Sequence, residues 1–379
     1  MINKSNLITV KPKIRSKGFK NENISLSEIN DVDFNYAFEK LKIKYNKNLK
    51  INSKDKDSEI IEKIYRSYLN FNNKEDIPKD GMILKKHENV ELKNISEKNL
   101  KRYFIYRYKF NIYPKLRIVD NFPPCVQIEP TSVCNYRCIM CYQADKTFSN
   151  KSNGFMGNME MSTFKKCIDE LEGNIEAITF ASRGEPTLNQ NFEKMIDYCE
   201  GKFLALKLNT NASMLNEKLI HKILSSDLQT IVFSIDAKDK DSYEKIRVNG
   251  KFDKVLKNLE MFNNIRNTQY KREDKIVRIS GVKINEDQDI NEMKKQWGDI
   301  ADIIAFTNYI PWESSYDNEI NSISTPCSEL WSRLFVWQDG KINPCDYDYK
   351  SVLSKWNVKE NSISDIWNSE YYNYLRYLH

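Results

Sequence analysis

Residues 134–141 read Cys134-Asn-Tyr-Arg-Cys138-Ile-Met-Cys141, and this stretch decides how the rest of the chain is interpreted. Three cysteines at the spacing C-x3-C-x2-C can hold three irons of a four-iron cluster, which leaves the fourth iron without a protein ligand. A structural zinc site normally takes four protein ligands and usually comes with paired C-x2-C knuckles. No second knuckle follows and the chain has only 3 His, so an iron–sulfur site is favoured over zinc or inert thiols.

The sequence around this motif alternates between short β-branched runs and helical patterns. The expected strands are Val126–Glu129, Glu176–Phe180, Phe203–Leu208, Thr230–Ile235, Val277–Val282 and Asp302–Phe306. The expected helices are Thr163–Leu171 (capped near Ser162), Asn191–Glu200, Asn216–Ser225, Asp239–Ile246, Phe252–Asn267 and Asp289–Trp297. This order predicts an α/β fold, a partial six-unit (β/α)6 barrel of parallel strands. The cysteine motif follows the first strand, at the end of the barrel where chemistry is expected.

Three regions are expected along the chain. Residues 1–115 form a Lys- and Asn-rich region, helical at Val32–Leu41 and Ser58–Leu69 and disordered over the first 30 residues. Residues 116–310 form the core barrel. Residues 320–379 form a small α+β extension, in which Gly340 turns a hairpin between Leu334–Trp337 and Lys341–Ile342.

Composition narrows the function classes further. Residues 1–120 hold 27 Lys or Arg against 16 Asp or Glu, but no nucleic-acid-binding motif accompanies this charge, so a solvated basic surface is the favoured interpretation. There is no apolar run of about 18 residues and no signal-peptide core, so we expect no membrane span and a cytoplasmic location. In a reducing compartment the 8 cysteines are more often metal ligands or buried thiols than disulfides.

At the cysteine motif the chain resembles the radical S-adenosylmethionine (SAM) superfamily, over roughly Phe122–Phe306. The resemblance implies a [4Fe-4S] cluster on Cys134, Cys138 and Cys141, whose open iron chelates the amino and carboxylate groups of SAM. It also implies reductive cleavage of SAM to methionine and a 5'-deoxyadenosyl radical that abstracts hydrogen from a substrate. The electron would come from a one-electron reductant such as flavodoxin or ferredoxin.

Further landmarks follow in the order that the family shows. Phe180-Ala-Ser-Arg-Gly184-Glu185-Pro186 resembles the glycine–glutamate motif that receives the amino group of SAM, with Arg183 in place of a first glycine. Many members have an aromatic residue where this chain has Met140, whose backbone is expected to contact the adenine. The cofactor-binding residues that the resemblance implies are Met140, Gly184, Glu185, Pro186, Asn209, Ser234 and Asp236. Ser234 and Asp236 are placed near the ribose or carboxylate of SAM, with helix capping as the alternative.

Other polar and sulfur-bearing residues receive weaker assignments. Arg247, Lys283 and Asn285 are candidate active-site polar groups, and no catalytic residue is assigned. Cys167 and Cys199 lie in expected helices and are interpreted as core thiols.

The C-terminal region resembles the start of the SPASM or twitch extension of the same family. Cys327 and Cys345 flank Gly340 at the spacing C-x12-G-x4-C, and they are candidate auxiliary-cluster ligands. No cysteine follows Cys345, so the extension is expected to be incomplete and to hold no complete four-cysteine cluster.

The leading hypothesis is therefore a radical SAM enzyme acting on an unidentified substrate, with oxidation, epimerisation and cross-linking all open as outcomes. A small polar or carbohydrate-like substrate is slightly favoured, because residues 1–115 show no strand-rich peptide-binding module. One alternative is a peptide- or protein-modifying maturase of the SPASM type. Another is a degenerate, non-catalytic iron–sulfur protein, against which the retained cysteines and Glu185 argue.

Overall fold

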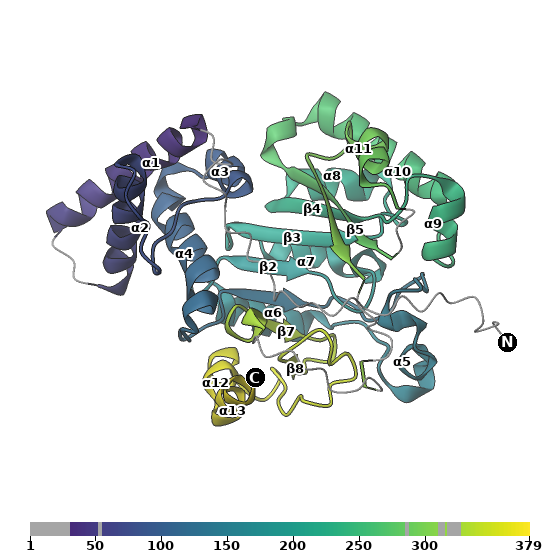
Figure 1. Cartoon of the computed structure of the whole chain (residues 1–379). Helices are drawn as coiled ribbons and strands as arrows, with labels where there is room; N and C mark the ends of the chain where they lie inside the picture. Colours follow the sequence, from purple (N-terminus) through teal and green to yellow (C-terminus); the bar gives the residue numbers. More distant parts are fainter. Residues whose placement is uncertain (1–30, 52–54, 285–287, 310–314, 317–326) are drawn as a thin grey trace.

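The computed structural model describes residues 31–51, 55–284, 288–309, 315–316 and 327–379. Its centre is one eight-stranded sheet with the strand order β6-β5-β4-β3-β2-β1-β7-β8 (Figure 1). All neighbouring strands are parallel except β7 and β8, which form an antiparallel pair. Two predictions fall outside the described residues: the disorder of residues 1–30 and the candidate active-site residue Asn285.

The six strands predicted for the barrel are all present, with ends that differ from the prediction by a few residues. They are β1 (Cys125–Ile128), β2 (Ala177–Phe180), β3 (Ala205–Thr210), β4 (Leu228–Ser234), β5 (Ile276–Lys283) and β6 (Ile303–Asn308). Each pairs in parallel with the next, for example Val126 with Ile178 and Ile178 with Leu206. The expected fold class, a six-unit open β/α barrel, is therefore confirmed.

Helices of the β/α units pack against one face of this sheet and form the main core. They are α6 (Met161–Leu171), α7 (Phe192–Tyr198), α8 (Glu217–Ser225), α9 (Lys240–Ile246), α10 (Phe252–Gln269) and α11 (Ile290–Trp297), and a single turn, α5 (Lys146–Ser149), follows the cysteine motif. The N-cap position of α6 is Glu160, two residues before the predicted Ser162, and its side chain makes no capping hydrogen bond. Cys167 and Cys199 are fully buried in this core, as predicted.

The N-terminal region is more helical than the sequence suggested. It contains α1 (Asp31–Ile51), α2 (Lys56–Asn72), α3 (Lys86–Lys93) and α4 (Leu100–Leu116), of which the last two were not predicted. These helices share a second core with Cys125, Ala177 and Leu204, which lie at or beside the first residues of β1, β2 and β3. The N-terminal helices therefore cover the end where the strands begin (Figure 1). That leaves the carboxyl ends of the strands for the cysteine loop.

The C-terminal extension joins the main sheet, which the sequence did not indicate. Its strand β7 (Arg333–Val336) runs parallel to β1, with Ile128 opposite Val336, and β8 (Ile342–Asn343) then pairs with β7. Gly340 makes the expected turn with a φ of +88°. The helices α12 (Ile363–Asn368) and α13 (Glu370–Leu378) complete the extension. Within the described residues, no helix is both long and apolar enough to cross a membrane.

Candidate active site

The three cysteines of the motif lie in the loop that leaves the carboxyl end of β1. Backbone amides two residues further on point at two of the sulfurs: Tyr136 N lies 3.4 Å from Cys134 Sγ, and Gln143 N lies 3.5 Å from Cys141 Sγ. The turn between the last two cysteines is closed by a 3.0 Å bond from Cys141 N to Cys138 O. Amide donors of this kind stabilise negative charge on cluster-bound sulfur.

Burial raises the pKa of all three thiols, that of Cys134 to about 12. The thiols are therefore neutral at pH 7 unless a positive metal centre holds them as thiolates. Among the described residues no three His, Cys, Asp or Glu side chains gather closely enough to hold one metal ion. A four-iron cluster binds each thiolate to a different iron, so this donor set fits a cluster better than it fits zinc.

The loop after β2 packs directly on the start of the cysteine loop. A Cβ at Gly184 would lie 2.2 Å from Thr131 O and 2.6 Å from Val133 O, so only glycine fits this position. Glu185 N donates to Val133 O at 2.9 Å and fixes the contact. Ser182, two residues before Gly184, has a φ of +133°, a strained conformation of a kind that gathers at functional sites.

Glu185 is buried and already accepts four hydrogen bonds from the chain. Oε1 accepts from Thr210 Oγ1 at 2.6 Å and from both the Oγ1 and the N of Thr187, at 2.6 and 3.2 Å. Oε2 accepts from Asn211 N at 2.7 Å. Three of these contacts fall on Oε1 and only one on Oε2, so Oε2 is the oxygen with room for an ammonium donor. Glu185 also ties the carboxyl end of β3 to the loop after β2.

The expected cofactor residues on β3 and β4 divide into two kinds. Asn209 and Ser234 are half-buried, and the buried Asn209 Oδ1 has no hydrogen-bond partner among the described residues. An orphaned acceptor at this strand end is consistent with a missing donor from a bound molecule. Asp236 instead accepts from Val282 N at 2.7 Å and pairs with Arg247 Nε at 2.7 Å. Helix α9 is capped by Asp239, so helix capping does not explain Asp236.

Arg247 connects Asp236 to the cysteine loop. Its Nη1 lies 3.9 Å from Cys138 Sγ. The carbonyls of the residues on either side of Arg247 accept hydrogen bonds from the cysteine loop: Ile246 O from Ile139 N, and Val248 O from Arg137 N. Met140 is buried in the cysteine loop, and Pro186 is buried in the loop after β2. Lys283 is the last residue of β5, which is four strands from β1 in the sheet.

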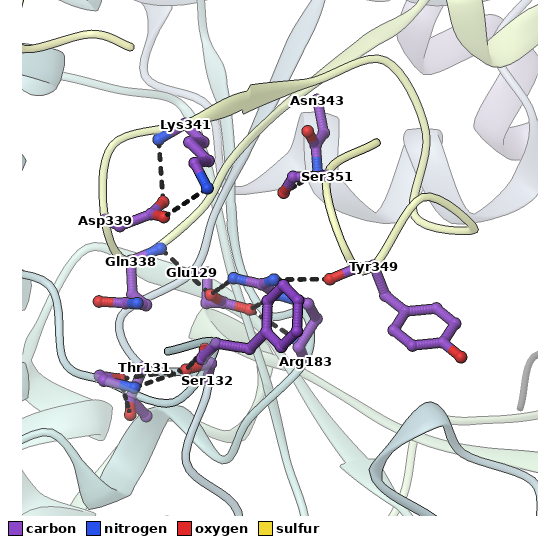
Figure 2. A network of polar contacts seen from close by, with 12 residues as sticks. Glu129, Thr131, Ser132, Arg183, Gln338, Asp339, Lys341, Asn343, Tyr349 and Ser351 are labelled. Carbon is purple, nitrogen blue, oxygen red and sulfur yellow. Dashed lines mark hydrogen bonds and ion pairs between the residues drawn. The ribbon is translucent and has the colours of Figure 1, made fainter. Parts of the chain in front are cut away.

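Arg183, directly before Gly184 in the loop after β2 (the Gly184 loop), forms an ion pair with Glu129 that was not predicted from the sequence. The side chain of Arg183 forms two bonds with Glu129, Nε to Oε2 at 2.7 Å and Nη2 to Oε1 at 2.6 Å, and its N donates to Oε2 at 3.0 Å. The third guanidinium nitrogen donates to Tyr349 O at 2.7 Å (Figure 2). Glu129 also accepts from Gln338 N. This pair could have been inferred from the sequence, because Glu129 and Arg183 carry opposite charges and lie at the ends of two consecutive predicted strands.

Tyr349 links the C-terminal extension to the cysteine loop. Its ring stacks on Tyr142, directly after Cys141, with centroids 5.2 Å apart, and its hydroxyl donates to Asp145 at 2.8 Å. Lys350 makes a 2.7 Å ion pair with the same Asp145 carboxylate. The extension therefore holds both loops of the candidate site, through Arg183 and through Tyr142.

The two cysteines of the extension lie close enough for their charges to interact. Tyr347 N points at Cys345 Sγ from 3.4 Å, which repeats the amide-to-sulfur turn of Cys134 and Cys141. Burial raises the pKa of Cys345 to about 12. No other cysteine belongs to this region of the sequence.

Comparison with protein families gives two matches. A model of the radical SAM superfamily matches residues 128–296, and a model described as an iron-sulfur cluster-binding domain, SPASM, matches residues 327–379. Both cover the segments that carry the cysteines described above.

Curated relatives are partial matches. The mycofactocin maturase MftC of Mycolicibacterium smegmatis is 28% identical over 162 residues, 41% of this chain and 39% of that protein. The uncharacterized protein MJ0804 of Methanocaldococcus jannaschii is 26% identical over 189 residues, 50% of this chain and 58% of that protein. The chain thus spans less than two thirds of the length of either relative.

Among solved structures, that of Streptococcus suis SuiB bound to its precursor peptide SuiA is similar with a TM-score of 0.54 and 16% identity. The alignment covers 84% of this chain and 80% of SuiB. At this identity the likeness shows the fold.

Proposed function

The chain belongs to the radical SAM superfamily and carries a SPASM domain, and from this premise we propose that it cleaves SAM reductively and uses the resulting radical on a substrate. The observation that carries the proposal is the shared packing of the cysteine loop, the Gly184 loop and the end of β3. When bound, the cluster and SAM supply one-electron chemistry and a carbon-centred radical. The electron would come from a reductant such as flavodoxin or ferredoxin.

The residues of the chain have separate tasks in this proposal. Cys134, Cys138 and Cys141 hold the cluster. Glu185 and the orphaned Asn209 Oδ1 receive polar groups of SAM, and Gly184 brings the backbone close to it. Arg247, paired with Asp236, places a positive charge beside Cys138 and so favours its thiolate form. Arg183 positions the Gly184 loop and does not contact the cofactor.

Two substrate classes are supported by different observations. The described N-terminal residues are helical and contain no strand, which favours a small polar substrate over a strand-bound peptide. The MftC relatives are named maturases and SuiB was solved with a precursor peptide, which favours a peptide substrate as the second candidate. Identification of the genes that neighbour this one separates them, since a short peptide gene would point to maturation.

The test of the proposed function is formation of 5'-deoxyadenosine by anaerobically reconstituted protein supplied with SAM and dithionite. The Cys134→Ala, Cys138→Ala and Cys141→Ala triple variant should form none. The matched control is Cys167→Ala, which removes a buried thiol from α6 and should retain the activity. Protein that holds a full cluster and binds SAM but forms no 5'-deoxyadenosine would support the non-catalytic alternative instead.

A further inference from the structure

The inner face of the sheet carries positive charge that no strand residue balances. Strand side chains alternate between faces, and Leu206, Leu208, Val277 and Ile279 point outward into the helix-covered core. Lys207 on β3 and Arg278 on β5 therefore point to the opposite, inner face. On β7, Leu334 and Val336 are core residues, so Arg333 also faces inward.

None of the strands β1–β8 contains an Asp or a Glu. Their only charged residues are basic: Lys207, Arg278, Lys283 and Arg333. Within the described part of the chain, no ion pair joins Lys207, Arg278 or Arg333 to a carboxylate. Half-buried cations without an ion-pair partner are costly to a fold, so their presence on one face needs a reason.

Two of these side chains also have unused donors. The Nε atoms of Arg278 and Arg333 are buried and lack a hydrogen-bond partner among the described residues. Among the residues that the structure describes, the Arg333 side chain makes one hydrogen bond, of 3.4 Å to the Gln127 side chain, whose amide nitrogen contacts Asp346 at 3.2 Å. The fixed fork of an arginine matches a carboxylate or a phosphate, so these donors are suited to an anion.

The three residues are close enough to influence one another. The pKa of Lys207 is lowered to about 8, mainly by burial and also by the charges of Arg333 and Arg278. The charges of Cys125 and Glu329 act in the opposite direction and raise it. All three side chains are half-buried rather than sealed from solvent. Through the strand pairing, Arg278 is level with Asn209, the residue that carries the orphaned acceptor at the end of β3.

We propose that Lys207, Arg278 and Arg333 form an anion-binding subsite that receives a carboxylate or phosphate group of the substrate. This inference rests on the proposed function and narrows it to an anionic substrate. The anion would be held on the inner face of the sheet, with the remainder of the substrate extending toward the carboxyl ends of the strands. Arg278, nearest the candidate SAM site, would then fix the distance between the anion and the reacting carbon.

The experiment is calorimetric titration of the cluster-loaded protein with inorganic phosphate and, separately, with succinate, at low ionic strength and without SAM or reductant. The test variant is the double substitution Lys207→Gln and Arg278→Gln. The matched control is Lys254→Gln with Arg66→Gln, which removes the same two charges from exposed helix positions. We expect saturable binding of at least one anion by the wild type and the control. The test variant should bind it about tenfold more weakly or worse, because charge-assisted hydrogen bonds are lost.

Equal loss of affinity in the test and control variants, or no saturable binding of either anion by the wild type, would overturn the subsite. If the double variant does not fold, each single substitution replaces it, and unchanged affinity in both single variants has the same meaning. A repeat titration with SAM present separates substrate from cofactor: if SAM displaces the anion, the cations receive the carboxylate of SAM and the substrate assignment is wrong. Because these titrations use no reductant, they can fail while 5'-deoxyadenosine formation succeeds, and the reverse.

Discussion

Arg183 and Glu129 form an ion pair in which the two side chains are 3% and 0% exposed, at the ends of neighbouring strands. The guanidinium of Arg183 also packs on the face of Trp337, with its carbon 4.4 Å from the ring centroid, and donates a hydrogen bond to Tyr349 O. Arg183, which stands where the family motif has a first glycine, thus connects the Gly184 loop to the C-terminal extension.

Arg183→Met should destabilise the protein strongly, because it leaves the Glu129 carboxylate buried without a partner. Breaking a buried pair in this way costs about 3–5 kcal/mol. Urea unfolding would measure the loss, and the double variant Arg183→Met with Glu129→Gln should recover part of it. The control is Lys240→Met, which breaks an ion pair with Asp253 whose partners are both mostly exposed and should change the stability little. Equal effects of the two single substitutions would contradict this account.

The second prediction concerns the cluster. Anaerobic reconstitution should give an oxygen-sensitive four-iron cluster that the triple alanine variant of Cys134, Cys138 and Cys141 cannot form. Iron and sulfide content and the visible absorption spectrum measure this. Unchanged iron in the triple variant would remove the basis for the assigned site.

The third prediction concerns the extension, where Cys327 and Cys345 are the only cysteines. Monomeric reconstituted protein should hold about four irons per chain, because a second four-iron cluster usually takes four thiolates. About eight irons, with half surviving in the triple variant and lost in Cys327→Ala, would show an auxiliary cluster completed by other ligands.

Glu185→Gln tests the acceptor proposed for the SAM ammonium. The substitution keeps the shape of the side chain but removes its charge, so SAM affinity should fall about tenfold or more by calorimetry. Iron content should remain at the wild-type value. Glu193→Gln, on the surface of α7, is the control and should bind SAM normally. Equal affinity of the Glu185 and Glu193 variants would reject the role.

Lys207 gives a prediction with a pH dependence. Its pKa is lowered to about 8 in the folded state from an ordinary value near 10.5, so the folded protein binds fewer protons than the unfolded chain between these values. Stability should therefore rise with pH across that window. Lys207→Met should be more stable than wild type at pH 7, by about 1 kcal/mol or more, and the difference should shrink above pH 8. Urea unfolding at pH 7 and pH 9.5 measures it, and a pH-independent difference would contradict the assignment.

The sequence predicted the barrel well because each β/α unit has a local signature. Strand patterns and helix periodicity located all six strands, and the order of motifs placed the cysteines after β1. Helix α4 was missed because it is buried on nearly all sides: Tyr103, Phe104, Ile105 and Tyr106 are consecutive buried residues, so no single apolar stripe exists. Pro114 in its last turn weakened the helical pattern further.

The rest of the site depends on contacts between distant residues. Glu129 and Arg183 are 54 positions apart and Tyr349 lies a further 166 residues along, so no local window contains their network. The charges of Lys207, Arg278 and Arg333 likewise acquire meaning only when the strands place them on one face. Chemistry-bearing motifs were visible in the sequence, and the residues that position them were not.

The parallel pairing of β7 with β1 has a consequence for the order in which the molecule can be built. The strand that precedes the cysteine loop is synthesised about two hundred residues before its second neighbour. Until β7 leaves the ribosome, one edge of β1 is unpaired, and such an edge is a template for association with other chains. A nascent chain that ended before β7 would therefore expose an unpaired strand edge beside its cysteine loop. Addition of β7 and the residues after it shields that edge and brings Tyr349 onto the cysteine loop, so the loop reaches its final packing only after residue 349 has been made.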